Sequence, residues 1–290
     1  TVAAIGMLSP HKRLYAARPI MISADCKRET AAEHRKAVLD PTIEAAESMR
    51  SITGLRIVSI ASDGETRRGG AIVDKTFLKP LPRDSNIYEL LCDLNLMDLW
   101  VGEDDLTGDK DFKHVFKRGR NRLLRVGGSK IISVLINPAI IRRHLESTGL
   151  SREHINAVLR PDDKQNVKLS VELLQDLWNL PAAPEGSSPT FIETRDALRI
   201  LGSFFYHLVA PYICVDMSLS EQLEHLSAAA HLAMVLYRDG QQEALPTLLY
   251  TDIMIMIKNV YFCVAKTKVD DPLSQFFLVL LGTWRPPQDS

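Results

Sequence analysis

The hydrophobic pattern of this chain changes near Pro138, and the change restricts the possible fold more than any other feature. Before this point, short β-branched runs alternate with helical stretches, whereas after it apolar residues recur at helical spacing. The sequence therefore predicts an α/β part followed by an all-helical part of similar size. Strands are predicted at residues 2–8, 19–24, 55–62 and 97–101, and the later helices at 140–147, 151–159, 165–180, 194–209, 220–238 and 245–265.

The first half of the chain also carries clear start and stop signals. Thr30 suits the N-cap of a helix that Pro41 should interrupt or kink and that Gly54 should end. The strand at 55–62 is expected to lead into a loop at 63–70, which places Asp63 where α/β folds usually carry their chemistry. A lone aspartate after a strand is more often a turn or capping residue, so Asp63 needs partners to be a catalytic residue.

Overall composition limits the classes of partner. The 290 residues carry a formal net charge of −1, so any binding of a polyanion must be local. The four cysteines are far apart and lack zinc-ligand spacing, which indicates reduced, mostly buried thiols of an intracellular protein. The apolar run at 248–264 contains Asp252 and Lys258, so the sequence predicts a buried helix there and no association with a membrane.

One predicted helix, close to residues 109–125, has an unusual charge pattern. From Phe112 to Leu145 the sequence has nine Lys or Arg residues and no Asp or Glu. A helix face that only meets solvent normally mixes both signs, and guanidinium groups hold phosphate oxygens in a planar fork. The pattern favours contacts with DNA phosphates that do not read the bases, with a plain solvated helix as the alternative. The candidate cations are Lys113, Lys117, Arg118, Arg120, Arg122, Arg125 and Lys130.

Three stretches resemble segments of the P-element-like transposases, the group that includes the THAP-type transposases. Residues 57–64 are similar to a family strand that ends in a Ser-Asp-Gly turn, and residues 164–174 to a family helix that begins Lys-Gln-x-Val-Lys-Leu. The most specific match is the family's Asp-x-x-His helix, in which Asp111, His114 and Asn121 occupy the motif positions. The order and approximate spacing of the stretches agree over most of the chain.

The resemblance implies an α/β fold with an incomplete RNase H-like sheet, flanking helices and a large all-helical insertion. The expected parts are a partial RNase H-like domain at 1–136, a helical insertion domain at 137–270 and a return segment at 271–290. The implied reaction is phosphoryl transfer on DNA in the nucleus, at two Mg²⁺ ions held by two Asp and one Glu. Asp63 matches the second of these acids, and Asp111, His114 and Asn121 are expected to support the site structurally.

The other two family acids have no match in this chain. The first would lie on a strand before residues 2–8, and the last would follow residues 276–283, where the sequence has no Glu. One carboxylate does not position a two-metal centre, so this chain alone is not expected to hold Mg²⁺. Without the family's opening strand, residues 2–8 and 55–62 must pair directly or leave backbone groups unpaired. Residues 267–270 match a short guanine-recognition pattern, but no phosphate-binding loop accompanies it, so GTP binding stays open.

Three functional hypotheses follow from these observations. The leading hypothesis is a catalytically silent, transposase-derived protein that binds DNA, with strong salt dependence. The second is an active Mg²⁺-dependent nuclease or transposase, in which Asp25 or Glu65 joins Asp63. The third is a helical protein-interaction module, in which the basic helix packs against the acidic run at 103–111.

Overall fold

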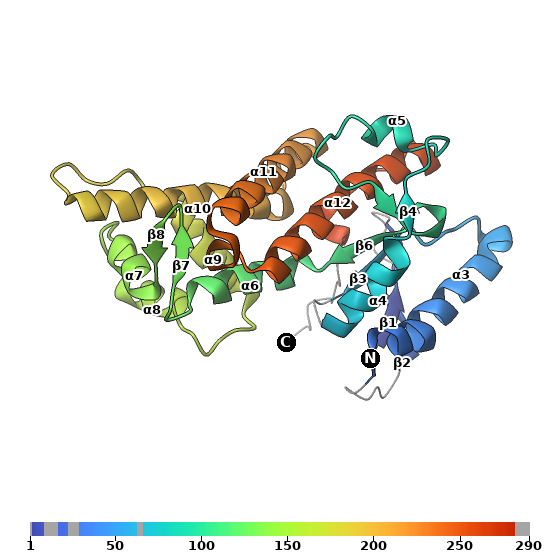
Figure 1. Cartoon of the computed structure of the whole chain (residues 1–290), viewed down its shortest axis with the longest axis horizontal. Coiled ribbons are helices and arrows are strands. Elements are labelled where there is room, and N and C mark those ends of the chain that lie inside the picture. Colours follow the sequence, from blue (N-terminus) through green and yellow to red (C-terminus); the bar gives the residue numbers. More distant parts are fainter. Residues whose placement is uncertain (1, 9–16, 23–28, 63–65, 282–290) are drawn as a thin grey trace. The chain divides into compact units, whose positions relative to one another are not determined.

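The computed structural model describes residues 2–8, 17–22, 29–62 and 66–281, and its fold is mixed α/β and mainly helical (Figure 1). The chain divides into two compact units. Unit 1 contains residues 1–111 and 255–290, and unit 2 contains residues 112–254. These limits differ from the boundaries expected after residues 136 and 270, and the assignment of an RNase H-like domain and an insertion stays a prediction.

The strands of unit 1 form three two-stranded sheets. β1 (Val2–Ile5) pairs antiparallel with β2 (Arg18–Ile22), as expected for two neighbouring strands, with an irregularity between Ala3 and Ala4. β4 (Lys79–Pro80) pairs antiparallel with β5 (Trp100–Val101). β3 (Ser59–Ser62) pairs parallel with β6 (Thr107–Lys110). Within the described ranges β1 and β3 belong to different sheets, so the direct pairing of residues 2–8 with 55–62 is not found.

No local pattern in the sequence predicts β6. Its residues, Thr-Gly-Asp-Lys, lack both an apolar run and an alternating pattern, yet all four are buried. Gly108 is required by close packing, because a Cβ atom there would lie 2.6 Å from the side chain of Ile72. The strand is therefore stabilised by its parallel hydrogen bonds to β3 and by its burial, and local strand propensity predicts neither of these.

The first helical region of unit 1 follows its predicted signals closely. Thr30 and Glu33 form a reciprocal capping box at the start of α2 (Ala31–His34). A π-helical turn, η1 (Arg35–Leu39), separates α2 from α3 (Asp40–Thr53), and Pro41 lies in the first turn of α3. Gly54 ends α3 with a left-handed φ of 69°. The interruption near Pro41 and the stop at Gly54 are therefore both confirmed.

Residues 66–70 form a helix, and the prediction of a loop over this range was wrong. α4 extends from Thr66 to Thr76 and includes Gly69 and Gly70. A Cβ atom at Gly70 would lie 3.1 Å from the Cβ of Ala31. The two glycines therefore mark a close approach to neighbouring residues, whereas the sequence analysis took them as loop residues.

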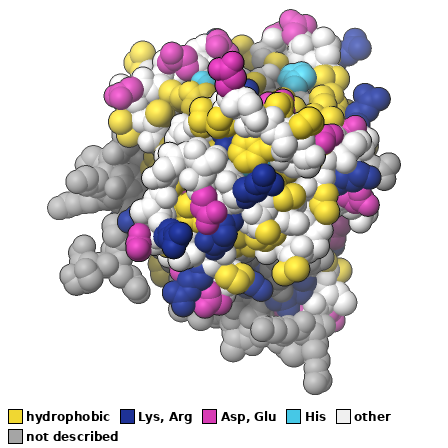
Figure 2. Space-filling model, turned by 90° about the vertical axis from the view of Figure 1, so that its left-hand side faces the viewer, with side chains coloured by type: hydrophobic (Ala, Val, Ile, Leu, Met, Phe, Trp, Pro, Cys, Tyr) yellow, Lys and Arg dark blue, Asp and Glu magenta, His cyan; other side chains and the backbone are white. Residues whose placement is uncertain are grey.

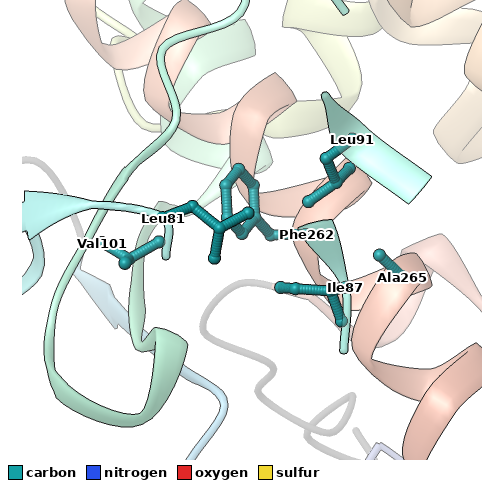
Figure 3. Close-up of a cluster of buried hydrophobic side chains, with 6 residues drawn as sticks. All are labelled: Leu81, Ile87, Leu91, Val101, Phe262 and Ala265. Atoms are coloured by element: carbon teal, nitrogen blue, oxygen red, sulfur yellow. The ribbon is translucent and has the colours of Figure 1, made fainter. Parts of the chain in front are cut away.

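A hydrophobic cluster joins the remaining elements of unit 1. α5 (Tyr88–Leu91) and β5 contribute Leu91 and Val101, which pack with Phe262 and Ala265 of α12 (Figure 3). α12 runs from Thr247 to Asp270, and its residues from Ile255 onward belong to unit 1. Two short 3₁₀ helices complete the unit, η2 (Glu103–Asp105) and η3 (Leu278–Leu280).

Unit 2 is built almost entirely from helices. They form where apolar residues recur at helical spacing, and the side chains of Asn137, Ser151, Asn166 and Ser188 cap four of them. A two-residue turn, with φ of 46° at Ile132 and 67° at Ser133, connects the strands of a β-hairpin. The elements are α6 (Phe112–Leu123), β7 (Ser129–Ile131), β8 (Val134–Ile136), α7 (Pro138–Glu146), α8 (Arg152–Val158), α9 (Val167–Trp178), α10 (Pro189–Ile213), α11 (Leu219–Ala244) and the start of α12.

α12 meets the length and composition expected of a membrane-crossing helix, and no other described helix does. About 67% of its most apolar window is buried inside the protein's own fold. Four of its polar or charged residues are buried as well, which suits a core helix with internal partners. They are Asp252, Lys258, Asn259 and Lys266.

Candidate nucleic-acid interface

α6 is the basic helix that the sequence analysis singled out, and its apolar stripe faces the core of unit 2. Phe112, Val115, Phe116 and Leu123 are buried. The ring of Phe112 stacks on Tyr212 of α10 at a centroid distance of 4.6 Å. The amphipathic helix was therefore predicted correctly, and packing on α10 fixes which way its charged rows point.

Arg120 is fully buried and binds backbone carbonyl groups of unit 2. Its Nε, Nη1 and Nη2 atoms donate to the carbonyl oxygens of Val158, Asp163 and Arg160, at 3.0, 2.7 and 2.8 Å. Burial lowers the pKa of the guanidinium, and the nearby carboxylates of Asp163 and Asp162 oppose that shift. This arginine fastens the segment after α8 to α6, so its guanidinium is not presented to a ligand.

Arg118 and Arg122 belong to a second row of α6 that also points into unit 2. Arg118 forms an ion pair with Asp252, whose side chain is almost completely buried. Arg122 donates through Nη2 to the backbone oxygens of Gln242, at 3.4 Å, and Glu243. Both guanidinium groups thus connect α6 to the end of α11 and the start of α12.

The row at positions 113, 117, 121 and 125 has a different environment. Lys117 Nζ donates to Gln165 Oε1 at 3.0 Å, and Asn121 Nδ2 donates to the backbone oxygen of Lys164 at 3.3 Å. The row therefore runs beside the segment that starts α9. Lys113 is partly exposed, its ammonium 5.6 Å from the centroid of the Phe112 ring, and Arg125 is exposed.

Lysines from the start of α9 extend this surface. Lys164 is exposed, and Lys168 is 85% exposed with only a 3.8 Å ion pair to Glu172. We call the set of Lys113, Lys117, Arg125, Lys164 and Lys168 the α6–α9 cations. The last of the predicted phosphate contacts, Lys130 on β7, is exposed and lies 3.7 Å from a carboxylate oxygen of Glu243.

The acidic residues after β3 and β6 were the predicted catalytic region. Asp63 lies outside the described residues, as do Asp25 and Glu65 of the alternative reading. Asp109 and Asp111 are buried at the carboxyl end of β6, and the backbone N–H of Asp111 donates to Ser62 O at 3.1 Å. His114 is partly exposed in the first turn of α6.

No metal-binding group can be assembled from the residues whose positions are given. Across those ranges, no three His, Cys, Asp or Glu side chains come together as a possible metal site. Mg²⁺ prefers near-octahedral oxygen ligation, and a two-metal centre needs several carboxylates at one place. The described side chains do not fit such a centre, and we derive no reaction step from one.

The acidic run at 103–105 has its partners within unit 1. Lys79 Nζ lies 2.5 Å from Glu103 Oε2, Asp104 pairs with Arg50 at 3.0 Å, and Ser85 Oγ donates to Asp105 at 2.7 Å. The interaction-module hypothesis expected these acids to contact the basic helix. The three acids instead bind Lys79, Arg50 and Ser85. Asp270, in the guanine-recognition-like sequence, accepts hydrogen bonds from Arg56 at 2.8 and 3.0 Å.

A buried polar cluster beneath β3 and β6 was missed by the sequence analysis. Lys266 Nζ donates to Val58 O at 2.7 Å and to Thr107 Oγ1 at 3.0 Å, and Thr107 Oγ1 donates to Asn259 Oδ1 at 2.7 Å. Burial lowers the pKa of Lys266 to about 8, mainly by desolvating the ammonium. A lysine at the end of an apolar helix usually reaches solvent, so the sequence held no clear signal of this burial.

Charges of both signs share the protein surface. Figure 2 shows one face of the molecule, on which Lys and Arg side chains are interspersed with Asp and Glu. This mixture agrees with the near-zero net charge, and it means that a phosphate-binding surface must be a local one.

Comparisons with known proteins give one informative likeness. No protein-family model matches the chain, and no curated protein does either. The fold is similar to a solved structure, the Drosophila P element transposase strand transfer complex, with a TM-score of 0.56 and 14% sequence identity. The likeness concerns the fold. It covers 84% of this chain and 56% of the transposase chain, and it supports a P-element-like transposase fold without the finer THAP-type assignment.

Proposed function

We propose that these 290 residues form a transposase-derived protein that binds DNA through its phosphates and does not cut it. The observation that carries the proposal is the likeness of the fold, over most of this chain, to a transposase in a strand transfer complex. The chemical argument for the absence of cleavage concerns these 290 residues alone: Asp63 is their single match to the family's three metal-binding acids, and one carboxylate does not position two Mg²⁺ ions.

The α6–α9 cations are the surface that we assign to phosphate contact. Lys164, just before α9, and Lys168, in its first turn, are exposed, and the backbone of Lys164 binds Asn121 of α6. Lys117 is buried and its ammonium binds Gln165, so it contributes charge beneath this surface and no direct phosphate contact. Three of the seven cations named from the sequence are excluded from this surface, because Arg118, Arg120 and Arg122 make internal contacts of unit 2.

Salt-dependent binding to a short DNA duplex tests this assignment. The charge-reversal variant Lys164→Glu/Lys168→Glu should bind at least about tenfold more weakly, and the slope of log K against log salt should become shallower by about 2. The matched control is Arg199→Glu/Arg238→Glu, which makes the same change in net charge at exposed positions of α10 and α11. Equal weakening in both variants, or no binding by the parent protein at low salt, would overturn the assignment.

The absence of cleavage needs its own assay. Supercoiled plasmid DNA incubated with the protein and Mg²⁺ or Mn²⁺ should remain intact. Nicking that is abolished by Asp63→Asn would instead establish the nuclease hypothesis, with other acids completing the site. A fold control by circular dichroism on Asp63→Asn ensures that loss of activity reports on the carboxylate and not on unfolding.

A further inference from the structure

Two histidines on neighbouring helices of unit 2 form a hydrogen bond with each other. His207 lies on α10 and His225 on α11, and their Nδ1 atoms are 2.8 Å apart. The ring centroids are separated by 4.8 Å, with an angle of 38° between the ring planes. Both side chains are partly exposed, so an ion from solvent can reach them.

The hydrogen bond between the rings shows how their Nδ1 atoms share a proton. A hydrogen bond between two Nδ1 atoms needs one nitrogen to donate and the other to accept, so at least one ring is neutral. The accepting Nδ1 atom therefore already presents a lone pair, and neutral imidazole nitrogen is a common metal ligand.

The surroundings add few competing charges. The carboxylate of Glu221, one helical turn before His225, accepts hydrogen bonds from the backbone N–H and hydroxyl of Ser218 at 2.8 and 2.7 Å. The ring of Tyr206 packs edge-on against His225 at 5.1 Å, and Trp178 of α9 packs against the same tyrosine at 5.6 Å. Aromatic rings thus restrict the imidazole of His225 without occupying its nitrogen.

Metal ions with different coordination geometries hold two ligand nitrogens at different distances from each other. Two nitrogens that ligate one metal at about 2.0–2.1 Å lie about 3.3 Å apart in a tetrahedral site and about 2.9 Å apart at adjacent corners of a square plane. The observed 2.8 Å is an N–H···N hydrogen-bond length near the square-planar value, and both rings must turn so that their lone pairs leave the N–N line and meet at one ion. Tetragonal nitrogen and oxygen ligation suits Cu²⁺ and Ni²⁺, and Cu²⁺ binds most strongly of the divalent first-row ions.

We propose that His207 and His225 form a two-histidine site for Cu²⁺ that bridges α10 and α11. The Nδ1 atoms of both rings occupy two adjacent positions of the square plane, and solvent oxygen fills the others. The ring that now donates its Nδ1 proton takes the Nε2 tautomer, so one hydrogen bond is exchanged for two nitrogen–copper bonds without net proton release. Elsewhere in the described ranges no third His, Cys, Asp or Glu completes such a group, so the site does not suit structural zinc, which takes four ligands.

Copper titration of the full chain tests the proposal. Isothermal titration with CuCl₂ at pH 7 should give one site that weakens at least about tenfold in His207→Ala and in His225→Ala. His231→Ala is the matched control, because His231 is an exposed histidine of α11 whose Nδ1 binds Ser227 O at 2.8 Å. Its affinity for copper should equal that of the parent protein.

Spectroscopy on the parent protein keeps the test independent of how the variants fold. The electron paramagnetic resonance spectrum of the one-copper complex should show an axial signal with hyperfine coupling to two equivalent nitrogens. Coupling to no nitrogen or one nitrogen, equal copper affinity in all the histidine variants, or tighter binding of Zn²⁺ than of Cu²⁺ would each overturn the proposal.

Discussion

The two units of the protein bury positive charge in different ways. In unit 2, Arg120 donates to three backbone carbonyls, and Arg195 donates through Nε to His144 Nδ1 at 3.0 Å and through Nη1 to Pro181 O at 2.9 Å. In unit 1, Lys266 has two oxygen acceptors, and Lys258 lies over the ring of Phe77 at 4.1 Å, with Asp98 at 3.3 Å.

The difference follows from the chemistry of the two side chains. A guanidinium has five N–H groups in a fixed plane and stays protonated, so it can join several loop carbonyls permanently. An ammonium is compact and gives up its proton when buried. Burial lowers the pKa of Lys258 and Lys266, the latter to about 8. Arginine therefore holds loop backbone in place in unit 2, whereas the buried lysines should make the stability of unit 1 increase at alkaline pH.

The largest loss of stability should come from removing the buried guanidinium of Arg120. Arg120→Met leaves the carbonyls of Val158, Arg160 and Asp163 without their donors, and the free energy of unfolding should fall by about 4 kcal/mol. Chemical denaturation followed by circular dichroism measures the change. Arg125→Met, at an exposed position of the same segment, should change stability by less than about 0.5 kcal/mol. An equal loss of unfolding free energy in the two variants would show that buried Arg120 is no more important for stability than exposed Arg125.

Lys266 should give unit 1 a stability that rises with pH. Its pKa is lowered to about 8 in the folded protein, so the unfolded chain binds more protons between about pH 8 and the ordinary lysine value. Relative to Lys266→Met, the free energy of unfolding of the parent protein should increase by about 2.5 kcal/mol from pH 7 to pH 10. Parallel pH profiles for the two proteins would show that burial does not lower the pKa of Lys266.

The histidine beside Arg195 should respond to acid. Burial, followed by the charges of Arg195 and Arg143, lowers the pKa of His144 to about 4. The unfolded chain then binds more protons between about pH 6.5 and 4, so stability is lost as the pH falls through this range. At pH 5 the loss should be about 2 kcal/mol, measured against His144→Asn. A parent protein that keeps its full stability at pH 5 would contradict the buried arginine–histidine contact.

Local signals in the sequence were sufficient for many elements of the fold. The helix start at Thr30 and its stop at Gly54 were predicted because capping and turn residues act over a few positions. β6 was missed because its formation depends on β3, almost fifty residues earlier in the chain. Local sequence pattern therefore specifies caps and turns, whereas tertiary packing decides whether β6 forms.

The candidate interface shows the same limit for function. The sequence identified the cations of α6 but not their directions, since the partners of Arg120 lie 38 to 43 residues further along the chain. A single-sign helix was interpreted as a phosphate-binding face, yet a guanidinium that satisfies carbonyls produces the same pattern. The likeness to a transposase fold agrees with the resemblance inferred from the motifs, while the roles of Asp63 and of the exposed cations stay predictions.

The turn between β7 and β8 has a practical consequence. Ile132 and Ser133 both adopt left-handed backbone angles, although a β-branched residue is poorly suited to that conformation. Asn-Gly is the preferred pair for a two-residue hairpin of this kind. Replacing Ile132 and Ser133 by Asn and Gly should therefore relieve about 1 kcal/mol of conformational cost, which makes this turn a starting point for engineering a more stable protein.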